Sequence, residues 1–451
     1  MSINLKYKKG EHVKKYSEMS KEELLSEKEI LVKEYDEYKK LNLELNMARG
    51  KPSLEQLDFS KELLNSIDTN IDDYYIDKDS GIDVRNYGCL TGLSGAKKIL
   101  ADMVGDKEEH VIVLGNSSLN VMYDQIARAM TKGIMGSKPW GKYEKIKWIC
   151  PVPGYDRHFK ITEHFGFEMI NVDINEDGPD MDKIEELIKD ENVKGIWCVP
   201  KYENPLGTSY SASVVKRFAA LKPKAKDFRI FWDNAYCVHH LYEDESKQDK
   251  IPNILEEAKK CKNPDMVFEF VSTSKITFPG AGISAIITSD NNIKDILESM
   301  SVQTIGHDKI NQLRHIKFLK DFNGLKEQMK KHAKVLRPKF EIVLEGFKRE
   351  LGKRDCGTWT KPRGGYFITF KSKKGLAKKI VETAKNAGLI LTDAGAPFPY
   401  KKDPNDSDIR IAPSFPSEED LKVAIKLFTV CVRLKTVDKL LNDHKSYGDD
   451  L

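Results

Sequence analysis

The chain lacks the features that mark secreted, membrane-bound and polyanion-binding proteins. Its seven scattered cysteines form no CxxC pair, which argues against a disulfide framework and a zinc knuckle. It has no apolar run long enough to cross a bilayer and no apolar signal core at its N-terminus. Charge of one sign is not in excess either, because 74 Lys and Arg face 70 Asp and Glu. These absences argue against nucleic acid or a membrane as a partner and predict a cytoplasmic protein with reduced thiols.

The composition that is present is that of a large globular protein. The 451 residues are 40% hydrophobic, 32% charged and 9% aromatic, which excludes global disorder and suits two or three packed domains. Residues 17–45 repeat apolar positions at helical spacing, and Ser20 with Glu23 forms a capping-box start. We therefore expect an N-terminal amphipathic helix.

From about residue 111 onward, short apolar runs alternate with segments long enough for helices. These runs predict an α/β domain with a mainly parallel, seven-stranded sheet covered on both faces. Residues 307–350 are helical in composition, with breaks expected at Gly324 and Pro338. Strand-like GGYFITF and IRIAP then mix with helices, which predicts a smaller α+β domain. The expected division is residues 1–60 packing with the small domain, 61–330 as the large domain and 331–451 as the small domain. The seven runs are VIVLGNSS, KWICPVP, MINVDI, GIWCVP, RIFWDN, VFEFVSTS and ISAIITS.

Three segments resemble known binding motifs, but the residues around each argue against that interpretation. GSKPWGKY ends in Tyr143 where a phosphate-binding loop needs Ser or Thr, and it follows a helical segment instead of a strand. GAGISA leads into a strand, whereas a dinucleotide-binding turn opens a helix. His239 and His240 are adjacent, so they do not face one metal ion together, and no metal site is expected.

The residues that carry chemistry follow the ends of the apolar runs, where open α/β sheets bind ligands. Lys275 comes directly after a run that ends in hydroxyl residues (VFEFVSTSK). Most lysines at such places are solvated, but an amine between apolar walls has a lowered pKa, as a Schiff-base lysine requires. Asp233 ends the apolar run RIFWD, where a buried carboxylate needs a cationic partner. The ring nitrogen of pyridoxal phosphate would be such a partner, and a helix N-cap is the alternative interpretation.

Other polar and aromatic groups occupy comparable places. Tyr236 and Asn204 could each hydrogen-bond the phenolic oxygen of that ring, although Asn204 before a proline alone indicates only a turn. Tyr155 follows a further strand and could stack on a flat cofactor. A phosphate would suit the N-terminus of the helix expected near Leu119. The residues before that helix are Asn116, Ser117 and Ser118.

Taken in order, GNSS, PGY, ENP, DNAY, STSK and IRIAPSFP resemble the fold-type I pyridoxal-phosphate aminotransferases over most of the chain. The segments ARGKPSLEQLDFS, YGCLTG, CPVPGYDRHF and SKITFPGAGISA are similar, more narrowly, to the class I subgroup Ic aspartate aminotransferases. This resemblance implies pyridoxal phosphate as cofactor and transamination between an amino acid, with aspartate the first expectation, and 2-oxoglutarate. It also implies a homodimer with shared active sites.

The resemblance further implies a role for each matching residue. Lys275 would bind the cofactor covalently and move the substrate α-proton, and Asp233 would pair with the pyridine nitrogen. Arg410, in IRIAPSFP, would bind the α-carboxylate of the substrate, and Tyr87, in YGCLTG, would reach the neighbouring subunit's phosphate. The remaining contacts would be Asn116, Ser117, Ser118 and Ser272 with the phosphate, Asn204 and Tyr236 with the phenolic oxygen, and Tyr155 with the ring face.

One position departs from the family pattern. An arginine eight residues beyond the lysine clamps the cofactor phosphate in most of this superfamily, and that position is Ile283 here. The phosphate is therefore expected to rely on hydroxyls, on N–H groups of a helix N-terminus or on a basic residue elsewhere.

A dicarboxylic substrate needs a second cation for its distal carboxylate. Arg157 is the first candidate and Arg49, beside Gly50 in ARGKPS, is the second, although either could be a structural salt-bridge arginine. The alternatives are an aminotransferase for aromatic or aliphatic amino acids, a lyase on the same fold, or a non-enzymatic regulator. The regulator is disfavoured because the segment before ARGKPS is too short for a DNA-binding domain.

Overall fold

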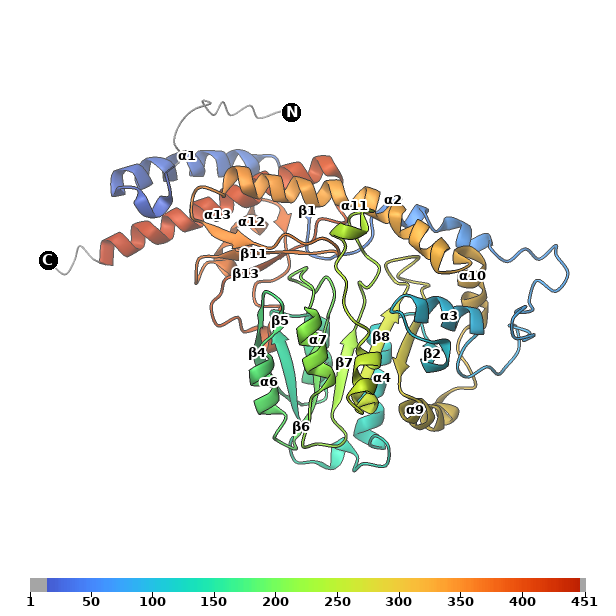
Figure 1. Cartoon of the computed structure of the whole chain (residues 1–451). Helices are drawn as coiled ribbons and strands as arrows, with labels where there is room; N and C mark the ends of the chain where they lie inside the picture. The colour runs from blue at the N-terminus through green and yellow to red at the C-terminus, as the bar shows by residue number, and fades with distance from the viewer. Residues whose placement is uncertain (1–13, 447–451) are drawn as a thin grey trace.

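The computed structural model describes residues 14–446, which form one large β-sheet, one small β-sheet and a separate two-stranded pair, with helices around them (Figure 1). The large sheet has eight strands in the order β2-β9-β8-β7-β6-β3-β4-β5. Neighbours from β8 through to β4 are parallel, whereas β2, β9 and β5 pair antiparallel. The seven predicted strands are confirmed, and only the two-residue β5 was too short to predict. Their bounds are β2 Val111–Leu114, β3 Lys147–Val152, β4 Glu168–Asn175, β5 Gly178–Pro179, β6 Val193–Cys198, β7 Arg229–Asp233, β8 Val267–Ser272 and β9 Ser284–Thr288.

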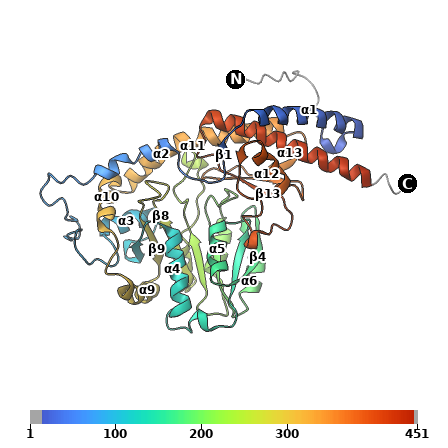
Figure 2. The ribbon, with the colours of Figure 1, turned by 180° about the vertical axis from the view of Figure 1, so that it is seen from behind.

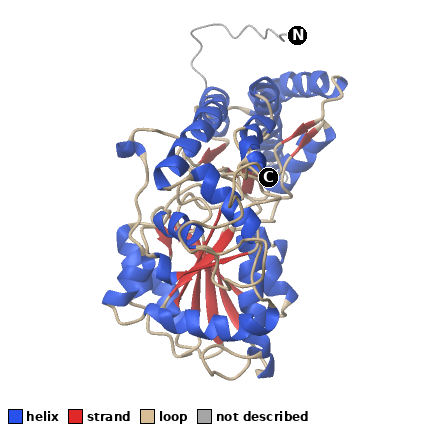
Figure 3. Ribbon diagram, turned by 90° about the vertical axis from the view of Figure 1, so that its right-hand side faces the viewer, coloured by secondary structure: helices blue, strands red, loops and turns tan. Residues whose placement is uncertain are grey.

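Both faces of this sheet are buried, because alternate side chains of each strand enter different cores. On β7, Ile230 and Trp232 belong to the core under α6, α7 and α8, whereas Phe231 belongs to the core under α4 and α5. Figure 1 shows α6 and α7 in front of the sheet, Figure 2 shows α4 and α5 from behind, and Figure 3 shows helices on both sides. These helices are α4 Ser118–Thr131, α5 Asp156–His164, α6 Met181–Leu187, α7 Ala212–Ala219 and α8 Ile254–Lys260.

The small sheet is built near the C-terminus, and the N-terminal segment packs into the same core. Its three antiparallel strands are β10 Gly357–Trp359, β11 Ile368–Ser372 and β13 Asp408–Ile411. A separate parallel pair joins β1 (Leu45–Asn46) to β12 (Leu389–Ile390). The predicted N-terminal helix is α1 (Lys21–Lys40), and it begins with the expected capping box between Ser20 and Glu23. It packs on α13 (Glu418–Ser446), and α12 (Ala377–Asn386) lies against the same core.

The connection between the two sheets differs from the prediction at Pro338. The chain turns between α10 (Lys309–Leu319) and α11 (Phe322–Glu350), close to the break expected at Gly324. Pro338, however, lies inside α11 and does not end it. The apolar stripe of Leu336, Phe340 and Phe347 continues through this point into the small-domain core, and its burial offsets the hydrogen bond that proline cannot donate. The other helices are α2 Leu54–Asp58, α3 Ser94–Asp102 and α9 Asp290–Gln303.

The segments whose motifs were rejected have structural roles. GAGISA runs into β9, as predicted. His240 accepts or donates a hydrogen bond with the Tyr202 hydroxyl at 2.6 Å, and all seven cysteines are free thiols. Within residues 14–446, no grouping of three His, Cys, Asp or Glu side chains could hold a metal ion, and no helix is long and apolar enough to cross a bilayer. The boundaries at residues 60 and 330 stay a prediction.

Candidate functional site

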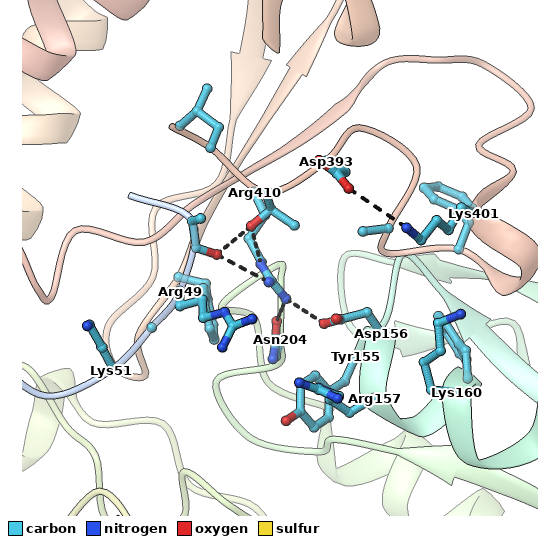
Figure 4. Close-up of a pocket in the computed structure, with 18 of the residues that line it drawn as sticks. Arg49, Lys51, Tyr155, Asp156, Arg157, Lys160, Asn204, Asp393, Lys401 and Arg410 are labelled. Atoms are coloured by element: carbon cyan, nitrogen blue, oxygen red, sulfur yellow. Dashed lines mark hydrogen bonds and ion pairs between the residues drawn. The ribbon is translucent and has the colours of Figure 1, made fainter. Parts of the chain in front are cut away.

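Two adjoining cavities lie where the strands β2, β3, β6, β7 and β8 end. The smaller, of about 220 Å³, is lined by residues that directly follow these strands. The larger, of about 560 Å³, extends toward the small sheet and is drawn in Figure 4. Tyr155, Asn204, Tyr236 and Lys275 line both cavities. Because the carboxyl ends of parallel strands meet at one edge of a sheet, residues spread along the chain share one site.

Lys275 lies in the turn after β8 with its ammonium group facing aromatic rings. Its Nζ is 4.8 Å from the centroid of the Tyr236 ring and 5.6 Å from that of Tyr366. Burial lowers the pKa of Lys275, while Tyr155 and Asp233 act in the opposite direction. The lysine is therefore closer to the neutral, nucleophilic form than a solvated lysine.

Two buried histidines that the sequence did not single out hold the turn around Lys275. His315 donates from Nδ1 to the Asn311 carbonyl, so its Nε2 accepts from the Thr277 hydroxyl at 2.9 Å. His332 donates from Nε2 to the carbonyl of Ile276 at 3.0 Å. Burial lowers the pKa of each histidine to about 4, so both rings are neutral near pH 7. Only the folded chain brings helices α10 and α11 to this turn, so local sequence gave no signal for them.

Asp233 ends β7 as a buried carboxylate with one oxygen free. Its Oδ2 is 2.9 Å from His158 Nε2. Its Oδ1 is buried and has no hydrogen-bond partner within the described chain. The His158 ring stacks on Trp197 with centroids 4.5 Å apart, which fixes the imidazole beside the carboxylate. The sequence prediction missed His158, although its position three residues after Tyr155 places both near the start of α5.

The opposite end of the smaller cavity is lined by hydroxyl groups at the start of α4. Ser117 is the N-cap of α4, but its side chain caps no backbone N–H, so the hydroxyl stays available. Ser118, Ser272 and Ser274 also line this end, and the sequence had placed Ser274 among the hydroxyl residues before Lys275 without assigning it a phosphate contact. Asn116 is exposed and does not line the cavity; its carbonyl accepts from the Ser274 hydroxyl at 3.2 Å.

Ile283 stands where most of the superfamily has an arginine for the cofactor phosphate, and it provides no contact of that kind. Its side chain lies in the core, and its backbone pairs with Thr273. Among the described residues that line the smaller cavity, Lys275 is the only cation. A dianion at the serine end would therefore rely on hydroxyls and on the N-terminus of α4.

These features fit pyridoxal phosphate. The free Oδ1 of Asp233 can accept from a protonated ring nitrogen, and without such a cation it would be a costly buried orphan. Hydroxyls and a helix N-terminus suit the phosphate at the other end, and Lys275 lines the space between. Burial raises the pKa of the Tyr236 phenol, so it remains a hydrogen-bond donor.

Arg410, on β13, reaches into the larger cavity and is almost fully buried. Its Nη1 donates to Asp156 Oδ1 at 3.0 Å and to Asn204 Oδ1 at 3.2 Å (Figure 4). Its Nε donates to the Thr392 hydroxyl at 3.2 Å, and its Nη2 to the Ala48 carbonyl at 3.4 Å. The guanidinium is thus held in a fixed orientation by α5, by the loop after β6 and by the segments that follow β1 and β12.

Arg49, Gly50 and Arg157 also line the larger cavity. Figure 4 shows Arg49 on the N-terminal segment and Arg157 at the start of α5. Both arginines are exposed, and within residues 14–446 neither guanidinium has an ion-pair or hydrogen-bond partner. Gly50 packs against Phe367, since an added Cβ would lie 2.5 Å from the ring. Neither arginine is therefore a structural salt-bridge residue in the part of the chain that the structure describes.

Tyr87, like Asn116, is a predicted residue that lines neither of the two cavities as the described chain forms them. Its side chain is 82% exposed, in the long loop between residues 65 and 94.

Known proteins resemble this chain over most of its length. A family model described as aspartate amino-transferase matches residues 19–444. An aspartate aminotransferase from Corynebacterium glutamicum is 45% identical over 418 residues, 92% of this chain and 94% of that protein. A crystal structure of an aspartate transaminase from the same species has a TM-score of 0.90 and 43% identity, covering 94% of this chain and 99% of that one.

A more distant structure shares the fold alone. The alpha-aminoadipate aminotransferase of Thermus thermophilus, complexed with N-(5′-phosphopyridoxyl)-L-leucine, is 19% identical with a TM-score of 0.68. The match covers 91% of this chain and 95% of the Thermus thermophilus chain. The family match spans most of the chain, and the predicted fold-type I architecture is confirmed. The chain therefore belongs to the aspartate aminotransferase family and is a pyridoxal-phosphate-dependent aminotransferase.

Proposed function

We propose that this enzyme is an aspartate aminotransferase, which converts L-aspartate and 2-oxoglutarate into oxaloacetate and L-glutamate. The observation that carries the proposal is one cavity lined by Lys275, the buried Arg410 and two exposed, unpartnered arginines. A dicarboxylic substrate needs a cation at each end, and this cavity offers both. The name of the Corynebacterium glutamicum relative supports the same substrate.

The proposed cofactor contacts follow from the donors and acceptors present. Asp233 would accept from the ring nitrogen, while His158 orients the carboxylate from the other side. Tyr236 would donate to the phenolic oxygen, and so would the amide nitrogen of Asn204, whose oxygen already faces Arg410. Tyr155 would cover the ring face. The phosphate would contact Ser117, Ser118, Ser272 and Ser274, with the backbone of Asn116 supporting the last of these.

In the proposed reaction, few residues of the chain act directly. Pyridoxal phosphate, when bound, would supply an aldehyde that takes up the amino group and a ring that withdraws electrons. Lys275, with its pKa lowered by burial, takes the α-proton of the amino acid and returns it to the cofactor side. Arg410 holds the α-carboxylate and thereby orients the α C–H bond. Both substrates use the same arginine in turn, so ping-pong kinetics are expected.

Replacing Arg157 by alanine is expected to reduce kcat/KM selectively for dicarboxylic substrates. Loss of a charge-assisted contact to the distal carboxylate should lower kcat/KM for aspartate about 100-fold. The kcat/KM values for alanine and phenylalanine should change little, because these substrates have no distal carboxylate. If Arg49 binds that carboxylate instead, Arg49→Ala gives the selective loss. Arg410→Lys lowers kcat/KM for every amino acid, because all share the α-carboxylate. Steady-state rates with a panel of amino acids, with and without 2-oxoglutarate, measure these effects.

The control is Arg217→Ala, since Arg217 pairs with Asp182 and Glu185 on the surface. It should leave the substrate panel unchanged. An aspartate rate that survives both Arg157→Ala and Arg49→Ala would refute the distal-carboxylate proposal. A wild-type enzyme that prefers aromatic amino acids would refute the substrate, and turnover without an oxoacid would indicate a lyase.

We also propose that two chains form a homodimer in which Tyr87 contacts the neighbouring cofactor phosphate. The support in one chain is an exposed apolar surface around Tyr87, where Gly306 packs on Gly88 and Ile305 is 60% exposed. Sedimentation is expected to give twice the chain mass, and Tyr87→Phe to weaken cofactor binding about tenfold. A monomer with full cofactor affinity would contradict this proposal.

A further inference from the structure

The guanidinium of Arg410 already donates four hydrogen bonds within the described chain. Nη1 donates two hydrogen bonds, to Asp156 and Asn204, and Nε and Nη2 each donate one. Since a guanidinium has five N–H donors, these four bonds leave a single one, on Nη2. A carboxylate binds Arg most strongly through two parallel N–H groups. Bidentate binding of a substrate therefore requires that an existing partner leave.

Asp156 is the partner best able to leave. It is the only anion among the four described partners, and its side chain is 33% exposed, whereas the Arg410 side chain is 7% exposed. Ala48 contributes a backbone carbonyl, and Asn204 is buried. A second carboxylate on the same guanidinium would repel Asp156 more than it would repel any neutral partner. Asp156 is also the first residue of α5, where the helix N-terminus stabilises a carboxylate that turns away from Arg410.

We infer that Asp156 is a resident carboxylate that occupies the substrate position on Arg410 in the empty enzyme and is displaced by the α-carboxylate of either substrate. The inference rests on the proposed role of Arg410 in binding that carboxylate. Asp156 is then a positioning residue: it keeps the buried guanidinium paired and oriented, and it weakens substrate binding by competing for Nη1. It takes no part in proton transfer, so its removal changes affinity and leaves the chemical step intact.

The test is to titrate cofactor-loaded wild-type and Asp156→Asn enzymes with succinate by calorimetry. Asparagine keeps the size of the side chain and removes its charge. The expected Kd for succinate is about tenfold lower in the variant, the difference made by one charge-assisted hydrogen bond. The KM values for aspartate and 2-oxoglutarate should fall in the same proportion while kcat stays unchanged. Asp156→Glu, which keeps the charge, should remain close to wild type.

A matched control is Asp182→Asn, which removes the same charge from the first turn of α6, where Asp182 pairs with Arg217 at 2.6 Å. It should leave the succinate Kd unchanged. A Kd that is unchanged or higher in Asp156→Asn overturns the inference; if that variant does not fold, Asp156→Ala is held to the same criterion. If the Kd is unchanged or higher in Asp156→Asn while Arg410→Lys abolishes the succinate binding of the wild type, the resident-carboxylate inference fails and the proposed role of Arg410 stands. If succinate binds neither wild type nor variant, the proposed role of Arg410 fails as well.

Discussion

Replacing Lys275 by methionine is expected to abolish transamination while making the ligand-free protein more stable at neutral pH. The amine is the only cation that lines both cavities in the described chain, and no other base there can replace it in moving the α-proton. The loss in kcat should be about 10⁴-fold or more, the upper end for a general base that also forms the covalent link. Steady-state assays and the absorbance of bound cofactor measure the effect.

The stability gain follows from the lowered pKa of Lys275. At a pH between the pKa of Lys275 in the folded protein and the ordinary pKa of lysine, the unfolded chain binds more protons than the folded chain. The free energy of unfolding of the wild type therefore rises with pH in this range. Methionine fills similar space and carries no charge to desolvate. The melting temperature of the variant should exceed that of the wild type at pH 7, and the gap should narrow as the pH approaches about 10. A less stable variant at pH 7 would show that the lysine is solvated, and retained turnover would exclude its catalytic role.

Asp233→Asn is expected to lower kcat by about 10³-fold with little change in KM. The amide preserves the shape of the side chain but cannot hold a proton on the ring nitrogen. Breaking a buried charge pair by removing one member costs about 3–5 kcal/mol, which corresponds to this range of rate. Rapid mixing with aspartate, followed by absorbance, separates the chemical step from substrate binding.

Asp227→Asn is the control for general damage to the sheet domain. Asp227 is also a buried carboxylate, and it pairs with Lys194 at 2.8 Å and accepts from Trp140, away from both cavities. Its replacement should lower the melting temperature and leave kcat per folded molecule unchanged. An equal loss of kcat in the two variants would assign the effect of Asp233→Asn to misfolding.

The strands of the large sheet could be predicted because each is a short apolar run, and parallel pairing brings their ends to one edge. That geometry alone accounts for the proximity of Lys275, Asp233 and Tyr155, which lie far apart in the sequence. Pro338 misled the prediction because a local rule for helix breaking was applied without the packing on either side of it. The apolar stripe that runs through Pro338 was the signal for one continuous helix.

Contacts between distant elements could not be predicted from one sequence. The pairing of Asp156 with Arg410 joins residues 254 positions apart, and it depends on how the small sheet lies over α5. His315 and His332 reach the Lys275 turn only because α10 and α11 pack against it. In sequence these are single polar residues on amphipathic helices, with nothing to distinguish them from surface positions.

The packing of α1 against α13 has a consequence for the order in which the protein folds during synthesis. The strands of the large sheet lie within residues 111–288, and the core under α6, α7 and α8 that covers one face of them is complete once Met329 of α11 has left the ribosome. The small-domain core cannot form that early, because the Arg433 guanidinium donates hydrogen bonds to Tyr16 and Glu27, which lie more than 400 residues before it in the sequence. The first helix made must therefore remain unpaired, with its apolar face uncovered, until the last one emerges. The larger cavity, which needs Arg49 from one end and Arg410 from the other, is completed only at that final step.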